Sequence, residues 1–297
     1  MPHPHRGAAL TELPPARGEA VQAPPALRYV AIGDSIPRGF LLGPPGWAPP
    51  GVCTAPQAWL LRWFDRPDRG YPALAARALR AAGTPVELDM SLTCTNSCSA
   101  TFWRGGPTAP VRRVFDRPAQ LVSVTVGAND VMGGWSAYVA AATALRLVAP
   151  ALRWDPQPVL DRLAPRRAAD AAVDRLQARL HDLLGWLVRH TDGPVVITTY
   201  HRGDESEVVR TRLVNPVNAA IRAAATGVPG VRLVDLEAVF AGHGLARPAG
   251  DRYVSRTDGL HPTDRGHRAI ARALLGTVPE VASGGRGYHR RNGRGTP

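Results

Sequence analysis

Several residue types are rare or missing in this sequence of 297 residues. There is no lysine, so all 36 basic residues are arginines, and against 24 acidic residues they give a net charge of +12. The arginines are scattered singly along helical segments, without the interleaved aromatic residues that favour a nucleic-acid surface. We attribute the charge to compositional bias and expect no nucleic-acid partner.

Cysteine is also scarce. Cys53, Cys94 and Cys98 are too few for a disulfide scaffold, and their odd number leaves at least one thiol free or paired with another molecule. None of them has a histidine or cysteine partner at the spacing of a zinc site, which argues against a bound metal.

Long apolar runs are missing as well. A transmembrane helix needs about 20 consecutive apolar residues, and the longest candidate, around residues 133–149, is interrupted by glycine and by Arg146. The N-terminal residues contain no apolar segment of the kind found in secretory signals. We expect no stable membrane insertion and a cytoplasmic location.

Composition divides the chain into three parts. Residues 1–26 are proline-rich and aperiodic, and residues 277–297 are rich in glycine and arginine, so we expect a flexible tail at each end. The residues between them, 27–276, have the apolar content of one soluble globular domain.

Short apolar runs alternate with helical patterns through this domain. The runs lack polar alternation and predict strands covered on both faces at 27–32, 85–90, 121–126, 194–200 and 231–236. Amphipathic patterns predict helices at 71–83, 168–190, 212–227 and 263–276. This order predicts an α/β fold, a three-layer α/β/α sandwich with a five-stranded parallel sheet. Proline- and glycine-rich insertions that would form lids or pocket walls lie at 41–69 and 150–167.

A serine follows the first predicted strand, in the sequence Gly33-Asp34-Ser35. Ligands of open parallel sheets bind beyond the carboxyl ends of the strands. Ser35 is therefore placed where a nucleophile would be needed, although a serine is also an ordinary turn residue.

The third predicted strand ends in "VTVGAND", which places polar residues at the same edge of the sheet. Gly127 would let the backbone approach a ligand, and the Asn129 amide could donate to an oxyanion. The alternative is a turn followed by a helix N-cap, for which Asn and Asp are favoured residues.

The sequence "RTDGLHPTDRGH" precedes the last predicted helix. A short loop can hold Asp258 against Nδ1 of His261, which leaves Nε2 facing a nucleophile. The alternatives are a loop aspartate and a surface histidine, and His267 is interpreted as a surface or core residue. Together, the three motifs provide a nucleophile, an oxyanion donor, a base and a carboxylate that orients the base.

On these motifs the sequence resembles the SGNH hydrolase (GDSL esterase/lipase) superfamily over about residues 27–276. "GDSIPRG" matches the first block with Ser35 as the nucleophile, "GAND" matches the block of Asn129, and "DGLH" gives Asp258 and His261. Two further stretches resemble the actinobacterial lipase-like branch. The resemblance implies a flavodoxin-like sheet.

The second block of the family contains a glycine whose backbone N–H joins the oxyanion hole. "TNSCSAT" places Ser99 at that position, so the resemblance implies an oxyanion hole made by Ser35, Ser99 and Asn129, with Asp34 and Gly127 as supporting residues. Secreted members of that branch contain several disulfides. By that comparison Cys53 could pair with either Cys94 or Cys98.

The resemblance implies a serine ester hydrolase of the carboxylesterase or lipase type. It would cleave small-molecule acyl esters through an acyl-enzyme and would need no cofactor or metal. An acyltransferase or thioesterase using the same triad is the first alternative. A binding protein on a degenerate scaffold is the second, and the intact Ser, Asn, Asp and His argue against it.

Overall fold

The computed structural model describes residues 25–44, 61–105, 109–132, 136–165, 170–202 and 207–282. Five parallel strands form one sheet in the order β2-β1-β3-β4-β5. Their bounds are β1 Leu27–Gly33, β2 Val86–Thr93, β3 Leu121–Thr125, β4 Val195–Thr198 and β5 Val231–Val234. The predicted flavodoxin-like sheet is confirmed, with β1 and β3 as direct neighbours.

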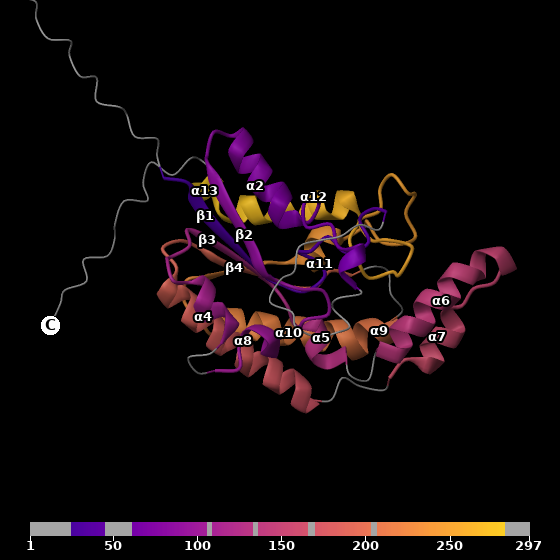
Figure 1. Ribbon diagram of the computed structural model, residues 1–297. Helices are drawn as coiled ribbons and strands as arrows, with labels where there is room; N and C mark the ends of the chain where they lie inside the picture. Colours follow the sequence, from indigo (N-terminus) through magenta and orange to yellow (C-terminus); the bar gives the residue numbers. More distant parts are fainter. Residues whose placement is uncertain are drawn as a thin grey trace, which may run out of the picture.

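Helices cover both faces of this sheet (Figure 1). One layer contains α2 Tyr71–Ala81, α11 Leu236–Phe240, α12 Asp264–Thr277 and α13 Pro279–Ala282. The other contains α3 Ser99–Phe102, α4 Pro110–Val114, α5 Ala128–Val131, α8 Asp170–His190 and α10 Asn215–Thr226. The remaining elements are η1 Arg62–Phe64, α6 Ser136–Leu152, α7 Gln157–Leu163, α9 Glu207–Val209 and the π-helical turn η3 Arg210–Val214.

Strand β1 shows why the predicted strands lack polar alternation. Val30 and Ile32 pack into the core on the α8 side, while Tyr29 and Ala31 pack into the core on the α12 side. All four side chains are fully buried. A strand covered on both faces needs apolar residues at consecutive positions.

The two long helices next to the sheet are defined by their sequences. The buried leucines of α8 repeat at intervals of three and four residues, which gives one apolar stripe along the helix: Leu176, Leu180, Leu183, Leu184 and Leu187. Helix α12 begins after Thr263, whose hydroxyl accepts the N–H of Gly266 and caps the helix.

Two predicted boundaries differ from the structure. Residues 150–167, expected to be an insertion, include the end of α6 and all of α7, which project from the body beyond α9 (Figure 1). Pro158 stands in the first turn of α7, where a missing N–H is tolerated. The fold also continues past residue 276, because Val281 of α13 is buried in the core. The remainder of both predicted tails and residues 45–60 lie outside the described residues.

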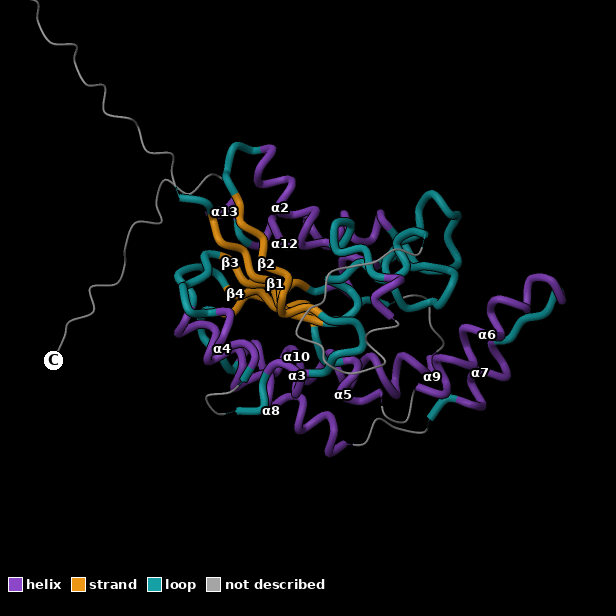
Figure 2. Tube along the Cα trace, in the orientation of Figure 1, coloured by secondary structure: helices purple, strands orange, loops and turns teal. Residues whose placement is uncertain are grey.

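Among the helices that the structure describes, none has both the length and the apolar character needed to cross a membrane. The carboxyl ends of the strands meet at one edge of the sheet, where several loops gather (Figure 2). At this edge β1 and β3 approach closely. A Cβ atom on Gly33 would lie 2.3 Å from the Thr125 carbonyl oxygen and 2.8 Å from Pro37.

We predict that Gly33→Ala destabilises the protein by about 1–3 kcal/mol, because the backbone of β1 or β3 must shift to admit the methyl group. Gly276→Ala is the control, since Gly276 lies exposed in α12 and no atom lies within 4 Å of an added Cβ. This change should raise the free energy of unfolding by roughly 0.5–1 kcal/mol. Urea denaturation measures both values, and a fully stable Gly33→Ala protein would contradict the tight contact.

Candidate active site

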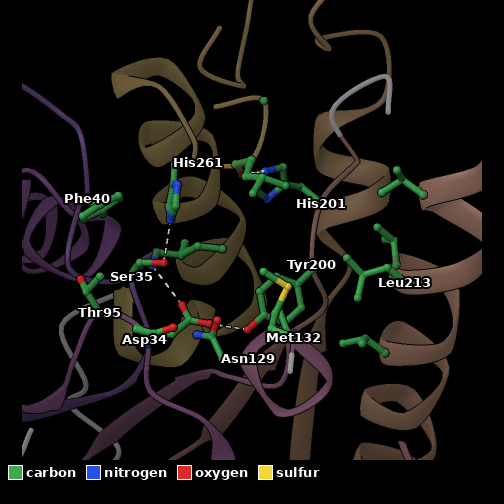
Figure 3. A pocket seen from close by; sticks show the side chains of 18 of the residues that line it. Asp34, Ser35, Phe40, Thr95, Asn129, Met132, Tyr200, His201, Leu213 and His261 are labelled. Atoms are coloured by element: carbon green, nitrogen blue, oxygen red, sulfur yellow. Dashed lines mark hydrogen bonds between the residues drawn. The ribbon is translucent and has the colours of Figure 1, made fainter. Parts of the chain in front are cut away.

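The turn after β1 directs Asp34 inward and Ser35 outward. The Asp34 N–H donates to the Thr125 carbonyl at 3.1 Å, and the Asp34 carboxylate accepts the N–H of Ile36 at 3.0 Å. Its second oxygen accepts the hydroxyl of Tyr200. Because Asp34 bonds two residues ahead in this way, it forms a tight turn that leaves Ser35 lining a cavity (Figure 3).

Ser35 meets the loop that precedes α12. Its Oγ lies 2.7 Å from Nε2 of His261, and Nδ1 of His261 hydrogen-bonds to the Asp258 carboxylate. That carboxylate also accepts the N–H of Leu260 at 2.9 Å and that of His261 at 3.1 Å. The hydrogen bond to Asp258 places the ring proton on Nδ1, so Nε2 is free to accept the Ser35 proton. The structure therefore brings together the three residues that the sequence predicts.

Electrostatics strengthens this arrangement. Burial alone would raise the pKa of Asp258, but the charge and hydrogen bond of His261, with two backbone N–H groups, lower it to about 2. Burial would lower the pKa of His261, yet the Asp258 carboxylate outweighs this, aided by the charges of Asp34 and Asp65, and the pKa lies above its usual value. An ionised Asp258 thus favours proton uptake by His261.

Asp34 differs from Asp258 in its surroundings. Burial raises the pKa of Asp34 to about 6, although the hydrogen bonds from Tyr200 and Ile36 oppose this shift. Its carboxylate shapes the nucleophile turn and has no direct contact with the His261 ring among the described hydrogen bonds. Asp34 therefore lies next to Ser35 and outside the hydrogen-bonded chain of His261 and Asp258.

Asn129 also lines the cavity (Figure 3). The N-cap of α5 is Gly127, and α5 has no side-chain capping bond, so the alternative of Asn129 as a helix cap is wrong. One N–H of the Asn129 amide donates to the Ser97 carbonyl at 2.9 Å, which leaves a second N–H for a ligand. Gly127 has φ 143°, a region that favours glycine.

Ser99 lies in a different environment from the one expected. Its backbone N–H donates to the Asp130 carboxylate at 2.7 Å, its hydroxyl bonds to the same carboxylate, and it is fully buried. The residue of this loop that lines the cavity is Asn96, with φ 66°. Asn is one of the few residues besides glycine that tolerates this conformation. The geometry gives no support to Ser99 as an oxyanion donor.

The cysteines divide into two kinds. Cys94 is disulfide-bonded and Cys98 has a free thiol. Cys53 lies outside the described residues. Within the described chain, no three His, Cys, Asp or Glu side chains are grouped so as to hold a metal ion.

Sequence reasoning missed two cavity residues, Tyr200 and His201, which follow β4. His201 Nε2 lies 2.7 Å from the Leu260 carbonyl oxygen, and burial lowers the pKa of His201 to about 4. A neutral His201 therefore donates to the loop that carries the Ser35 partner. Tyr200 is the last residue of the strand predicted at 194–200 and His201 the first after it, at the edge where ligands bind, and this position was the available signal.

The sequence left open whether His267 is a surface or a core residue, and the structure shows that it is a core residue. It is fully buried in α12, and its Nδ1 accepts the N–H of Tyr71 at 3.2 Å. Burial lowers the pKa of His267 to about 3, so it stays neutral.

The cavity at Ser35 has a volume of about 300 Å³. Besides Ser35 and His261 it is lined by residues from the nucleophile turn, the strand ends, the residue before η1, the α9–α10 segment and the loop before α12: Asp34, Ile36, Phe40, Leu61, Thr95, Asn96, Ala128, Asn129, Met132, Tyr200, His201, Val209, Leu213, Val214, Val217, Gly259 and Leu260. A serine–histidine–aspartate chain that opens on such a cavity is an arrangement that serine hydrolases of several kinds use.

Comparison with known families agrees with this geometry. The model of the GDSL-like Lipase/Acylhydrolase family matches residues 31–269. The chain belongs to this family. Membership supports an ester hydrolase in general, and a triad with an oxyanion hole is typical of the family.

Solved structures of esterases are distantly similar. The acetyl xylan esterase AlAXEase has 15% identity and a TM-score of 0.49, over 85% of this chain and 100% of that one. A putative GDSL-like lipase from Parabacteroides merdae has 15% identity and a TM-score of 0.49, over 87% and 95%. The aryl esterase of M. smegmatis has 15% identity and a TM-score of 0.45, over 86% and 100%. No curated protein matches the sequence.

We predict a structural role for the Ser99 side chain. Ser99→Ala removes one hydrogen bond to the buried Asp130 carboxylate, which should lower the free energy of unfolding by about 1–3 kcal/mol. Turnover per folded molecule should change little, because Ser99 lies outside the cavity lining. Denaturation and kcat are measured on the same preparation, and a stable but slow variant would contradict this role.

Proposed function

We propose that this protein is a serine ester hydrolase of the carboxylesterase or lipase type that works through an acyl-enzyme. The observation that supports this most strongly is the hydrogen-bonded chain from Ser35 through His261 to Asp258, open to the cavity at Ser35. The substrate is a small-molecule acyl ester.

The first half of the reaction acylates Ser35. His261 Nε2 takes the hydroxyl proton as Ser35 Oγ attacks the ester carbonyl carbon, and Asp258 stabilises the imidazolium. The free N–H of Asn129 and the backbone N–H of Ser35 donate to the oxyanion. The loop at Asn96, which lines the cavity, is better placed than Ser99 to provide a further backbone donor. As the tetrahedral intermediate collapses, His261 gives the proton to the leaving alcohol.

The second half hydrolyses the acyl-enzyme. A water molecule takes the place of the alcohol and gives a proton to His261 as its oxygen attacks the acyl carbon. Collapse of this second intermediate releases the carboxylic acid and returns the proton to Ser35. No other reactant is needed for the two steps to balance.

We predict that Ser35→Ala removes nearly all ester turnover and all labelling by a serine-directed phosphonate, because the covalent route is lost. Its melting temperature should stay close to that of the wild type. Ser91→Ala is the matched control, since Ser91 is exposed on β2 and lies outside the cavity lining. Substantial turnover or labelling in the Ser35→Ala protein would refute the nucleophile.

A second prediction concerns pH. Only neutral His261 accepts a proton, so kcat/KM should rise with pH through a midpoint above 6.5, the usual pKa of histidine. Asp258→Asn removes the charge that raises the pKa of His261, so this midpoint should move to lower pH. The value of kcat should fall by roughly 10⁴-fold.

The Asp34 carboxyl, with its pKa of about 6, also titrates in this range. It is present in both proteins, so the difference between their pH profiles isolates the effect of Asp258. An unchanged midpoint in Asp258→Asn would show that Asp258 does not set the basicity of His261.

A further inference from the structure

The wall of the cavity farthest from His261 is made of apolar side chains. The wall consists of Val209 of α9, Leu213 of η3, Val217 of α10 and Met132, which is the residue after α5. Figure 3 shows Leu213 across the cavity from His261 and Phe40, with Met132 and Tyr200 between them. The three aliphatic side chains are each more than nine-tenths buried. This end of the cavity therefore presents carbon and thioether sulfur to a ligand.

The polar side chains lie near Ser35, and each makes a hydrogen bond within the protein, although Nδ1 of His201 and one N–H of Asn129 keep no partner among the described residues. Asn129 donates to Ser97, the Tyr200 hydroxyl donates to Asp34, and His201 bonds to the Leu260 carbonyl. A sugar reaching the apolar wall would lose water from its hydroxyl groups without gaining partners there, which is unfavourable. An aliphatic chain loses no hydrogen bonds to water by the same transfer, and burial of its apolar surface is favourable.

The reaction geometry decides which part of an ester reaches this wall. The leaving oxygen must lie within reach of His261 Nε2 to receive its proton, and the oxyanion must face Asn129. The leaving group then lies on the side of His261, whose ring is 4.8 Å from that of Phe40. The acyl chain is the remaining substituent of the tetrahedral carbon, and it extends away from His261 toward Leu213.

We propose that Met132, Val209, Leu213 and Val217 form an acyl-chain pocket that selects esters of medium-chain aliphatic acids over acetyl esters. This inference rests on the proposed ester hydrolysis and adds its substrate class. The volume of about 300 Å³ corresponds to about ten groups of the size of a water molecule, at roughly 30 Å³ each. After the ester oxygens are counted, this leaves room for at most about eight acyl carbons, fewer where the leaving group shares the cavity beside Phe40.

The first test uses the full chain and p-nitrophenyl esters from acetate to palmitate. Each methylene that enters the pocket should raise kcat/KM by about fourfold, up to about octanoate. Longer chains overfill the cavity, so kcat/KM should then fall. A maximum at acetate, with a steady decrease for longer chains, would overturn the pocket.

The second test changes the size of the pocket in both directions. Leu213→Ala removes three carbons from the wall and should move the optimum to a chain about three carbons longer. Val217→Phe fills part of the cavity and should lower the octanoate-to-butyrate ratio of kcat/KM at least tenfold. Ala219→Phe is the control, since Ala219 is exposed on the same helix outside the lining, and it should leave the ratio unchanged.

These outcomes separate the two proposals. If no ester is cleaved and the phosphonate labels nothing, the hydrolase itself is refuted. If esters are cleaved but Leu213→Ala leaves the optimum in place, the hydrolase stands and the pocket is wrong. Should Val217→Phe fail to fold, Leu213→Ala still decides, because it only removes atoms. The inactive Ser35→Ala protein gives a readout without turnover: octanoate should raise its melting temperature more than acetate does at equal concentration.

Discussion

The hydrogen bond from the Asp34 N–H to the Thr125 carbonyl continues the pairing of β1 with β3 one residue past the end of β1. The positions of the site residues depend on where the pairing of β1 with β3 ends, at Gly33 and Thr125. Gly33 brings the two backbones so close that no side chain fits between them. Beyond this point the chains diverge, and Ser35 and Asn129 leave neighbouring strand ends toward one cavity. In an open parallel sheet, ligands bind beyond strand ends of this kind.

A buried network of hydroxyl groups lies across the same strands. Tyr29 bonds to Ser123 at 2.8 Å, Tyr71 to Thr125 at 2.9 Å, and Thr125 to Thr198 at 2.9 Å. These groups are paired with one another, so their burial is tolerated, and burial raises the pKa of both tyrosines so that they stay neutral. The network links the three strands whose ends carry the site, and Tyr71 also ties α2 to them.

The sequence predicted the elements whose signal is local. Five apolar runs were sufficient for the sheet and for its edge. The motifs at that edge pointed to Ser35, Asn129, Asp258 and His261, of which the structure brings Ser35, His261 and Asp258 into one hydrogen-bonded chain. The predicted role of Ser99 finds no support in the structure, because its backbone N–H already donates to a partner 31 residues away, the Asp130 carboxylate. In that loop Asn96, with φ 66°, lines the cavity, and residue similarity alone contains no information on φ.

Helix α10 was predicted, but its effect on the site was not. Its buried Asn218 accepts the N–H of Tyr200 at 2.8 Å and donates to the carbonyl of the same residue at 2.9 Å, as a neighbouring strand would. An asparagine within the apolar stripe of a helix was the only sign of this contact. This pair of hydrogen bonds holds Tyr200 in place, and the Tyr200 hydroxyl donates to Asp34, next to Ser35.

The apolar wall depends on the start of the same helix. Pro216 has no N–H, so the Arg212 carbonyl cannot receive the usual bond from four residues ahead. Just before Pro216, the Asn215 N–H reaches the Arg210 carbonyl five residues back, which is the hydrogen bond of the π-helical turn η3. Leu213 in this turn and Val217 just after it both line the cavity. The side chain of Asn218 follows directly, so one short segment positions the hydroxyl behind Ser35 and the surface that we propose receives the acyl chain.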